Sequence, residues 1–215
     1  MPSLPTFPGA TVAVVASGPT LTDAAVAPLR GRVPVVAVND AIRLVPWANV
    51  LYSSDRRWWA VVGPSSTVQA YTGVKVSIGW RPGDASPIPK HPDVQVLVNT
   101  GDEGLELDPG GLRTGRHSGY AAINLAVHLG ARRILLLGYS LGRVGGRAHF
   151  FGAHPAVLHQ TTDAQYAQFR QAYLTLAPAL QQAGVEVLNC TPSSHLHTFP
   201  NVPLADALAM EPVAC

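Results

Sequence analysis

Short apolar runs separated by polar turns divide most of the chain into predicted strands and helices. The runs are rich in valine, isoleucine and leucine, and most of them stay apolar over nearly their whole length. Uninterrupted apolar runs are typical of parallel strands that are covered on both faces of a sheet. We therefore predict strands at residues 11–16, 33–39, 49–54, 74–78, 94–98, 134–137 and 185–189.

Helical spacing fills several of the stretches between these strands. Apolar residues recur three and four positions apart before Gly130, which supplies the left-handed residue typical of a helix C-terminus. A second long helix is predicted at 161–183, starting at Thr162 and Asp163. It should be bent or broken at Pro178, because proline lacks an N–H to donate. Shorter helices are predicted at 21–29, with Thr20 or Thr22 as cap, at 41–45 and after Val202.

Strands that alternate with helices through short connections predict an open, mostly parallel α/β sheet with helices on both faces, a Rossmann-like arrangement. The chain has 215 residues, of which 47% are hydrophobic and 13% are charged, enough for one substantial core. We therefore expect a single Rossmann-like nucleotide-binding domain over residues 1–215. Residues 1–10 are a proline-rich lead-in, and residues 63–111 are the least regular part, interpreted as an insertion or a lid.

Composition narrows the class of protein further. The net charge of +2 neither requires nor excludes a nucleic-acid partner. The two cysteines, Cys190 and Cys215, form no disulfide framework, which favours a reducing compartment. No apolar run reaches the roughly 20 residues that span a membrane, and residues 1–10 lack the features of a signal peptide. We expect a soluble cytoplasmic protein, and the sequence is compatible with either a monomer or a homo-oligomer.

Polar residues follow the predicted strands and precede the central helix. The carboxyl ends of parallel strands meet at one edge of a sheet, where such sheets bind ligands. Neither a G-x-G-x-x-G fingerprint nor a Walker A loop follows any strand, so the phosphates would meet free N–H groups at a helix N-terminus. The candidate nucleotide-binding residues are Ser17, Gly18, Pro19, Thr20, Asn39, Asp40, Asp55, Ser118, Gly119, Gly138, Ser140, Ser193 and Ser194.

Two histidines in a glycine-rich loop, His149 and His154, are the candidate catalytic residues. Histidine beside an apolar wall, here two phenylalanines, suits proton transfer near neutral pH. Zinc binding with His117 and His159 is one alternative, and ordinary loop histidines are another. No Asp-x-Asp pair follows a strand, so we predict no metal site and expect arginine or N–H groups to stabilise a leaving phosphate.

Five segments together resemble known proteins that share a Rossmann-like domain. They cover most of the chain and read ASGPTLT, VNDAIRLVPWANVLYSSDRRWW, TGRHSGYAAINLAVHLGARRILLLGYS, GRAHFFGAHP and VEVLNCTPSS. The set looks like a family of uncharacterised phage and prophage proteins. More distantly it resembles archaeal 6-hydroxymethylpterin pyrophosphokinase-like proteins and bacterial sialyltransferases that use CMP-sialic acid.

The resemblance to the sialyltransferases implies a site without a metal or a cofactor, in which the substrate is a nucleotide or nucleotide sugar. A histidine of the FFGAH segment, His154 in preference to His149, would be the general base toward an acceptor hydroxyl. Ser140 stands where these relatives carry aspartate, so no contact of that carboxylate is carried over. The nucleotide contacts that the resemblance implies are Gly18-Pro19-Thr20, Asn39, Ser118-Gly119 and the loop after Gly138, and Pro192-Ser193-Ser194 resembles the family's Pro-x-Ser segment after the last strand.

Three functions are compatible with this sequence. The leading hypothesis is a metal-independent, glycosyltransferase-like enzyme that moves a sugar from a nucleotide donor to a hydroxyl acceptor, such as a modified DNA base or a glycan. The second is a pyrophosphokinase that uses ATP and magnesium on a hydroxymethyl heterocycle, with Asp40 and Asp55 as metal ligands. The third is a non-catalytic nucleotide-binding phage protein. In a phage setting, the compartment would be the host cytoplasm.

Overall fold

Eight parallel strands form one sheet in the computed structural model, which describes residues 3–211 and leaves Cys215 outside the described residues. The sheet order is β6-β5-β4-β3-β2-β1-β7-β8, and each neighbouring pair is parallel. The predicted open α/β sheet is confirmed. The strands are β1 (Thr11–Val15), β2 (Val35–Val38), β3 (Val50–Tyr52), β4 (Val74–Ile78), β5 (Val94–Asn99), β6 (Gly111–Leu112), β7 (Arg133–Leu137) and β8 (Glu186–Asn189).

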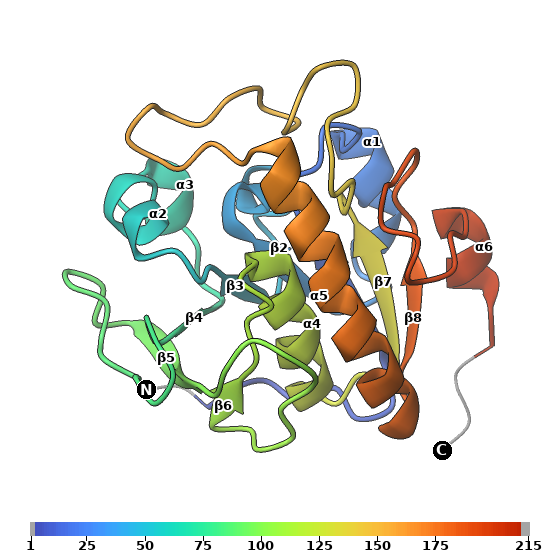
Figure 1. Ribbon diagram of the computed structural model, residues 1–215, viewed down its shortest axis with the longest axis horizontal. Coiled ribbons are helices and arrows are strands. Elements are labelled where there is room, and N and C mark those ends of the chain that lie inside the picture. The colour runs from blue at the N-terminus through green and yellow to red at the C-terminus, as the bar shows by residue number, and fades with distance from the viewer. Residues whose placement is uncertain (1–2, 212–215) are drawn as a thin grey trace.

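Helices cover both faces of this sheet. Val12 and Val14 of β1 pack with α4 and α5 on one face, whereas Ala13 and Val15 pack with the shorter helices on the other. Figure 1 shows α4 and α5 in front of the sheet and α6 beside β8. The helices are α1 (Asp23–Val26), the 3-10 helices η1 (Ala27–Leu29) and η2 (Asn39–Arg43), α2 (Arg56–Val61), α3 (Ser66–Gln69), α4 (Ser118–His128), α5 (Asp163–Gln182) and α6 (Leu204–Ala209).

The strand order reverses at β1. From β1 the chain adds β2 to β6 on one side and then returns to place β7 and β8 on the other. In such sheets, the loops at the carboxyl ends of the two strands that flank the reversal diverge and form a binding crevice. The segment between β7 and α5 arches over this end of the sheet, at the top of Figure 1. The topology therefore brings the loops after β1 and β7 next to each other.

Two helices differ from the prediction at their prolines. The predicted helix 21–29 becomes a four-residue α1 followed by η1, because Pro28 has no N–H for continued α-helical bonding. Thr22 caps α1, as predicted. The break predicted at Pro178 is wrong, since α5 runs through it as one helix. Proline leaves the carbonyl four residues earlier, at Leu174, without its partner, and Leu174 is exposed, so water can satisfy that carbonyl.

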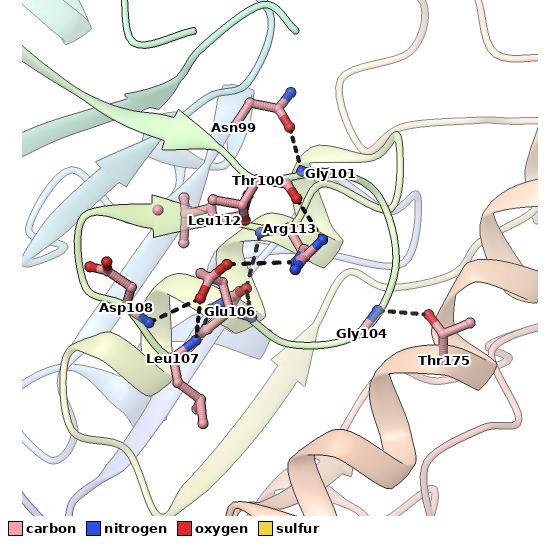
Figure 2. A network of polar contacts seen from close by, with 12 residues as sticks. Asn99, Thr100, Gly101, Gly104, Glu106, Leu107, Asp108, Leu112, Arg113 and Thr175 are labelled. Carbon is pink, nitrogen blue, oxygen red and sulfur yellow. Dashed lines mark hydrogen bonds and ion pairs between the residues drawn. The ribbon is translucent and has the colours of Figure 1, made fainter. Parts of the chain in front are cut away.

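Segment 63–111 supplies part of the sheet. It contains β4 and β5, which the sequence predicted, and β6, which is only two residues long and was not predicted. Figure 2 shows how the β5–β6 connection is held: Glu106 accepts the N–H groups of Leu107 and Asp108 at 3.0 and 3.1 Å. Arg113 donates to the Thr100 carbonyl at 2.5 Å. These contacts fix an irregular connection against the end of the sheet.

Asn124 anchors the same connection to α4. Its side-chain oxygen accepts the N–H groups of Glu106 and Arg113 at 2.9 and 3.1 Å, and its amide donates to the Glu106 carbonyl at 2.8 Å. Asn124→Ala should therefore lower the free energy of unfolding by about 2 kcal/mol, because buried backbone groups lose their partners. Gln182→Ala, which changes an exposed amide at the end of α5, is the control. Urea denaturation measures both, and equal losses would contradict the anchoring role.

None of the helices within residues 3–211 combines the length and the apolar composition that a bilayer-spanning helix requires.

Candidate functional site

A cleft of about 240 Å³ opens at the carboxyl edge of the sheet, where the strand order reverses. Seven parts of the fold line it: the ends of β1, β2, β3 and β7, the start of α4, the β7–α5 segment and the start of α5. Ten of the candidate site residues line this cleft. They are Ser17, Gly18, Asn39, Asp55, Ser118, Gly119, Gly138, Ser140, His149 and His154.

The turns after β1 and β7 are in direct backbone contact. Gly18 N–H donates to the Gly138 carbonyl at 2.9 Å. A Cβ at Gly18 would lie 2.5 Å from the Gly138 carbonyl oxygen, and a Cβ at Gly138 would lie 2.5 Å from the Ala16 carbonyl oxygen. Gly138 also has a φ of +71°, which side-chain-bearing residues rarely adopt. Both glycines are therefore required by the close approach that forms one wall of the cleft.

Two oxygen atoms of residues in the cleft wall are buried without a hydrogen-bond partner. They are Oδ1 of Asn39 and Oγ of Ser140, which is 2% exposed. Asn39 has a φ of +52°, a left-handed conformation that asparagine tolerates better than most residues and that turns the chain at the end of β2. Buried polar atoms without partners are uncommon, and each costs roughly 1–3 kcal/mol. A ligand with hydrogen-bonding groups would satisfy both atoms.

The first turn of α4 forms the floor beside these atoms. His117 precedes the helix without capping it through its side chain, so the first N–H groups stay available to an anion. The Ser118 hydroxyl lies 2.6 Å from that of Ser54 at the end of β3. Gly119 admits the Tyr139 ring, whose hydroxyl donates to the Gly119 carbonyl at 2.9 Å. These contacts hold the start of α4 against the loop after β7.

The two candidate catalytic histidines lie against each other. The ring centroids of His149 and His154 are 4.4 Å apart, and the His149 ring stacks on Phe151. Burial, together with the neighbouring His154, lowers the pKa of His149 to about 4. Burial also lowers the pKa of His154, and the Asp40 carboxylate partly opposes this shift. Both rings are therefore neutral at pH 7, the state in which a histidine can accept a proton.

Asp40 lies behind His154 and does not line the cleft. The carboxylate is fully buried, and its Oδ2 accepts the indole N–H of Trp58 at 2.8 Å. Arg43 lies 2.5 Å from its other oxygen. His154 Nδ1 is 3.9 Å from Oδ2 and has no hydrogen-bond partner of its own. The structure thus places Asp40 next to the histidine pair, away from any nucleotide in the cleft.

Four further candidate residues also lie outside the cleft lining. Thr20 lines a separate, largely apolar groove of about 570 Å³ between α1 and α6. Ser194 is engaged internally, because its hydroxyl donates to the Tyr139 carbonyl at 2.6 Å and accepts from Asn189 at 2.9 Å. This loop follows the edge strand β8, one strand further from the reversal point than β7. The other residues outside the lining are Pro19 and Ser193.

Sequence reasoning did not assign the side of the cleft formed by α5. Tyr166 and Phe169 face the cleft from this helix, and Phe169 packs against the His117 ring with centroids 4.8 Å apart. Aromatic residues at helical spacing ordinarily signal core packing, so the sequence contains no signal for this role. The lining also includes Ser54, Arg116 and Thr161, together with His117 and His159, which the sequence analysis named only as alternative zinc ligands. Trp58 and Trp59, in contrast, pack in the core.

The buried histidines predict that the protein loses stability in acid. Burial lowers the pKa of His117 to about 4, as for His149, whereas the unfolded chain titrates near 6.5. Between these values the unfolded chain binds more protons, so stability is present above pH 6.5 and falls as pH drops toward 4. From pH 7 to pH 5 we expect a loss of about 2 kcal/mol for each of these two histidines.

His117→Phe tests this expectation, because phenylalanine keeps the packing on Phe169 and removes one titrating ring. Chemical denaturation at pH 7 and pH 5 should show a smaller acid-induced loss in the variant than in the wild type. An identical loss in both proteins would show that His117 does not titrate as described.

Metal ligation and similarity to other proteins add two further findings. Within residues 3–211, no three histidine, cysteine, aspartate or glutamate side chains are grouped so as to hold a metal ion. Comparison of the chain with protein-family models, with curated proteins and with solved structures finds no significant match.

Proposed function

We propose that this protein is a nucleotide-dependent transferase of the glycosyltransferase type, which moves a sugar from a nucleotide donor to a hydroxyl acceptor. The cleft at the reversal point binds the nucleotide, and His154 removes the acceptor proton. The acceptor is a hydroxyl of a modified DNA base or of a glycan. The resemblance of several cleft segments to sialyltransferases that use CMP-sialic acid agrees with this proposal.

The observation that carries the proposal is the pair of unsatisfied polar atoms beside an uncapped helix. Asn39 Oδ1 and Ser140 Oγ are buried without partners in the same cleft as the first turn of α4. Hydroxyl or amino groups of a ribose or a base can form hydrogen bonds with Asn39 Oδ1 and Ser140 Oγ. A phosphate can accept hydrogen bonds from the helix N–H groups. A nucleotide combines these requirements in one ligand.

His154 supplies the chemistry at the other side of the cleft. The acceptor O–H bond breaks as its proton passes to the His154 ring, and the acceptor oxygen forms the new bond to the sugar carbon. The bond between that carbon and the phosphate oxygen breaks, and its electron pair leaves with the nucleotide. The N–H groups of α4 stabilise the negative charge that develops on the phosphate. His149 stays neutral and contributes an apolar, desolvated surface around the reacting atoms.

Thermal denaturation in the presence of nucleotides tests the binding step. A ligand at 100 times its dissociation constant adds about 2.7 kcal/mol of stability, which raises Tm by several degrees. We expect a shift with a nucleotide or nucleotide sugar from a panel of nucleoside mono-, di- and triphosphates and their sugar conjugates. A shift with cytidine nucleotides alone would favour the sialyltransferase-like donor. A panel without any shift would contradict nucleotide binding.

The same assay separates the alternative functions. A pyrophosphokinase requires magnesium and ATP, so binding that depends on magnesium would favour that reaction. Asp40 would have to be one ligand, and it is fully buried between Trp58 and Arg43. A non-catalytic protein would bind the intact nucleotide tightly and release no product. A transferase releases free nucleotide over time when donor and acceptor are both present.

Ser140→Ala should weaken nucleotide binding by about 10-fold, because the ligand loses one hydrogen bond in a buried site. Serine and alanine are similar in size, and the Ser140 hydroxyl has no partner within the protein, so folding should be unaffected. Ser66→Ala, at an exposed position in α3, is the matched control and should bind like the wild type. Isothermal titration calorimetry measures both. Unchanged affinity in Ser140→Ala would remove this hydroxyl from the proposed site.

A further inference from the structure

We propose that Asp40 is the positioning residue for His154: its buried carboxylate binds the Nδ1–H of the imidazole and directs Nε2 toward the acceptor hydroxyl. This inference rests on the proposed function for the role of the proton transfer. The pairing of the two side chains does not depend on that function and can be measured without a substrate.

The Asp40 carboxylate is held in place by Trp58 and Arg43 and lies beside His154. Trp58 donates its indole N–H to Oδ2 at 2.8 Å, and the Arg43 guanidinium lies 2.5 Å from Oδ1. The side chain is completely buried, so it has no contact with solvent. The remaining neighbour is Nδ1 of His154, at 3.9 Å from Oδ2. A buried carboxylate fixed on two sides thus lies next to a buried ring nitrogen that has no hydrogen-bond partner.

The 3.9 Å separation between His154 Nδ1 and Asp40 Oδ2 is longer than a hydrogen bond. Catalytic hydrogen bonds are often long in the free enzyme and tighten when the substrate binds. The His154 side chain is 14% exposed and belongs to a loop with no helix or strand of its own, so a small rotation can close the gap. Closing it fixes the tautomer with the proton on Nδ1 and leaves Nε2 free to accept a proton.

The charges around the pair explain why a carboxylate is needed there. Arg43 and Asp40 form an ion pair, and His154 adds a positive charge beside it when it takes the acceptor proton. Asp55 and His149 are the other titratable groups that act on the pair. Without Asp40, the Asp55 carboxylate alone would oppose the Arg43 guanidinium at the imidazolium. The proton on Nε2 passes to water after the product leaves.

NMR titration of the histidine C2–H signals of the wild-type protein and of variants tests this pairing directly. The His154 signal is assigned by its loss in His154→Gln. In Asp40→Asn, the His154 titration midpoint should fall by about one pH unit or more, because the favourable carboxylate is replaced by a neutral amide. In Arg43→Gln, the midpoint should rise, because a repelling charge is removed. Asp93→Asn is the control, because it breaks an ion pair with Lys75 at the amino-terminal ends of β4 and β5. It should leave the His154 midpoint unchanged.

An unchanged or raised midpoint in folded Asp40→Asn would overturn the pairing. Should Asp40→Asn fail to fold, Arg43→Gln decides, because Arg43 is about half exposed and its replacement leaves the buried carboxylate in place. A raised midpoint of the His154 titration in Arg43→Gln then supports the electrostatic coupling of His154 to the Asp40–Arg43 ion pair. An unchanged midpoint overturns it.

The activity readout distinguishes this inference from the proposed function. With donor and acceptor present, Asp40→Asn should lower kcat by about 10- to 100-fold with little change in the KM of the donor, and the acid limb of the pH profile should move to lower pH. Equal loss of kcat in Asp40→Asn and Asp93→Asn would contradict positioning. If the NMR shifts occur and no transfer is ever detected, the pairing of Asp40 with His154 stands and the transferase proposal fails.

Discussion

Replacing His154 with glutamine should lower the rate of sugar transfer by about 100- to 10,000-fold, the range that a positioned general base contributes. Glutamine has a similar length and can hydrogen bond, but it cannot take a proton at neutral pH. The loss should fall on kcat, because His154 acts on the acceptor and the nucleotide contacts come from the β1, β2, β7 and α4 segments. Release of free nucleotide from the donor, measured with the acceptor present, gives the rate.

The matched control is His197→Gln, which changes an exposed histidine that does not line the cleft. It should turn over at the wild-type rate. The wild-type profile should rise with pH through a midpoint below 6.5 and reach a plateau near neutrality, because burial lowers the pKa of His154 and the base must be neutral to act. Wild-type turnover in His154→Gln would assign the base to another residue, and His149→Gln would then be the next variant to measure.

Gly138→Ala should lower the free energy of unfolding by about 3–4 kcal/mol, because the added methyl group meets backbone atoms. The added Cβ would lie 2.5 Å from the Ala16 carbonyl oxygen and 3.0 Å from the Gly18 nitrogen, both of which are backbone atoms. A backbone contact cannot be relieved by rotating a side chain. The turns after β1 and β7 would have to separate, which would also disrupt the wall of the cleft.

Gly31→Ala is the control for the backbone conformation. Gly31 has a φ of +72°, nearly the same as the +71° of Gly138, and a Cβ there would meet nothing within 4 Å. Its replacement should cost only the conformational term, about 1 kcal/mol. Urea denaturation of both variants therefore isolates the effect of the close approach. Similar losses in the two variants would mean that the β1 and β7 turns are not in the tight contact described.

The sequence predicted the sheet well because buried parallel strands leave a simple signal. All seven predicted strands are present, and each lies within or close to its predicted range. β6 was missed because a run of two residues, Gly111 and Leu112, has no periodicity to detect. The all-parallel order and the position of the reversal at β1 depend on which strands pair, and contacts of that kind are not encoded in local periodicity.

The candidate site was predicted where it depends on strand ends and less well elsewhere. Residues that follow β1, β2, β3 and β7 could be found because a parallel sheet brings its carboxyl ends together. The same rule put Asp40 and Ser194 in the site. Asp40 follows the cleft-lining Asn39 directly but is fully buried, and Ser194 is engaged in internal hydrogen bonds. The side provided by Tyr166 and Phe169 depends on how α5 packs across the sheet, which only the folded chain determines.

The central claim is that a nucleotide binds in the cleft between the β1 turn, the β7 turn and the first turn of α4. Hydrogen–deuterium exchange, with and without the nucleotide that raises Tm most, tests this location most directly. The account predicts slower exchange in peptides that contain residues 16–18, 117–120 and 138–140. Protection confined to the groove between α1 and α6, or protection in none of these three peptides, would contradict it.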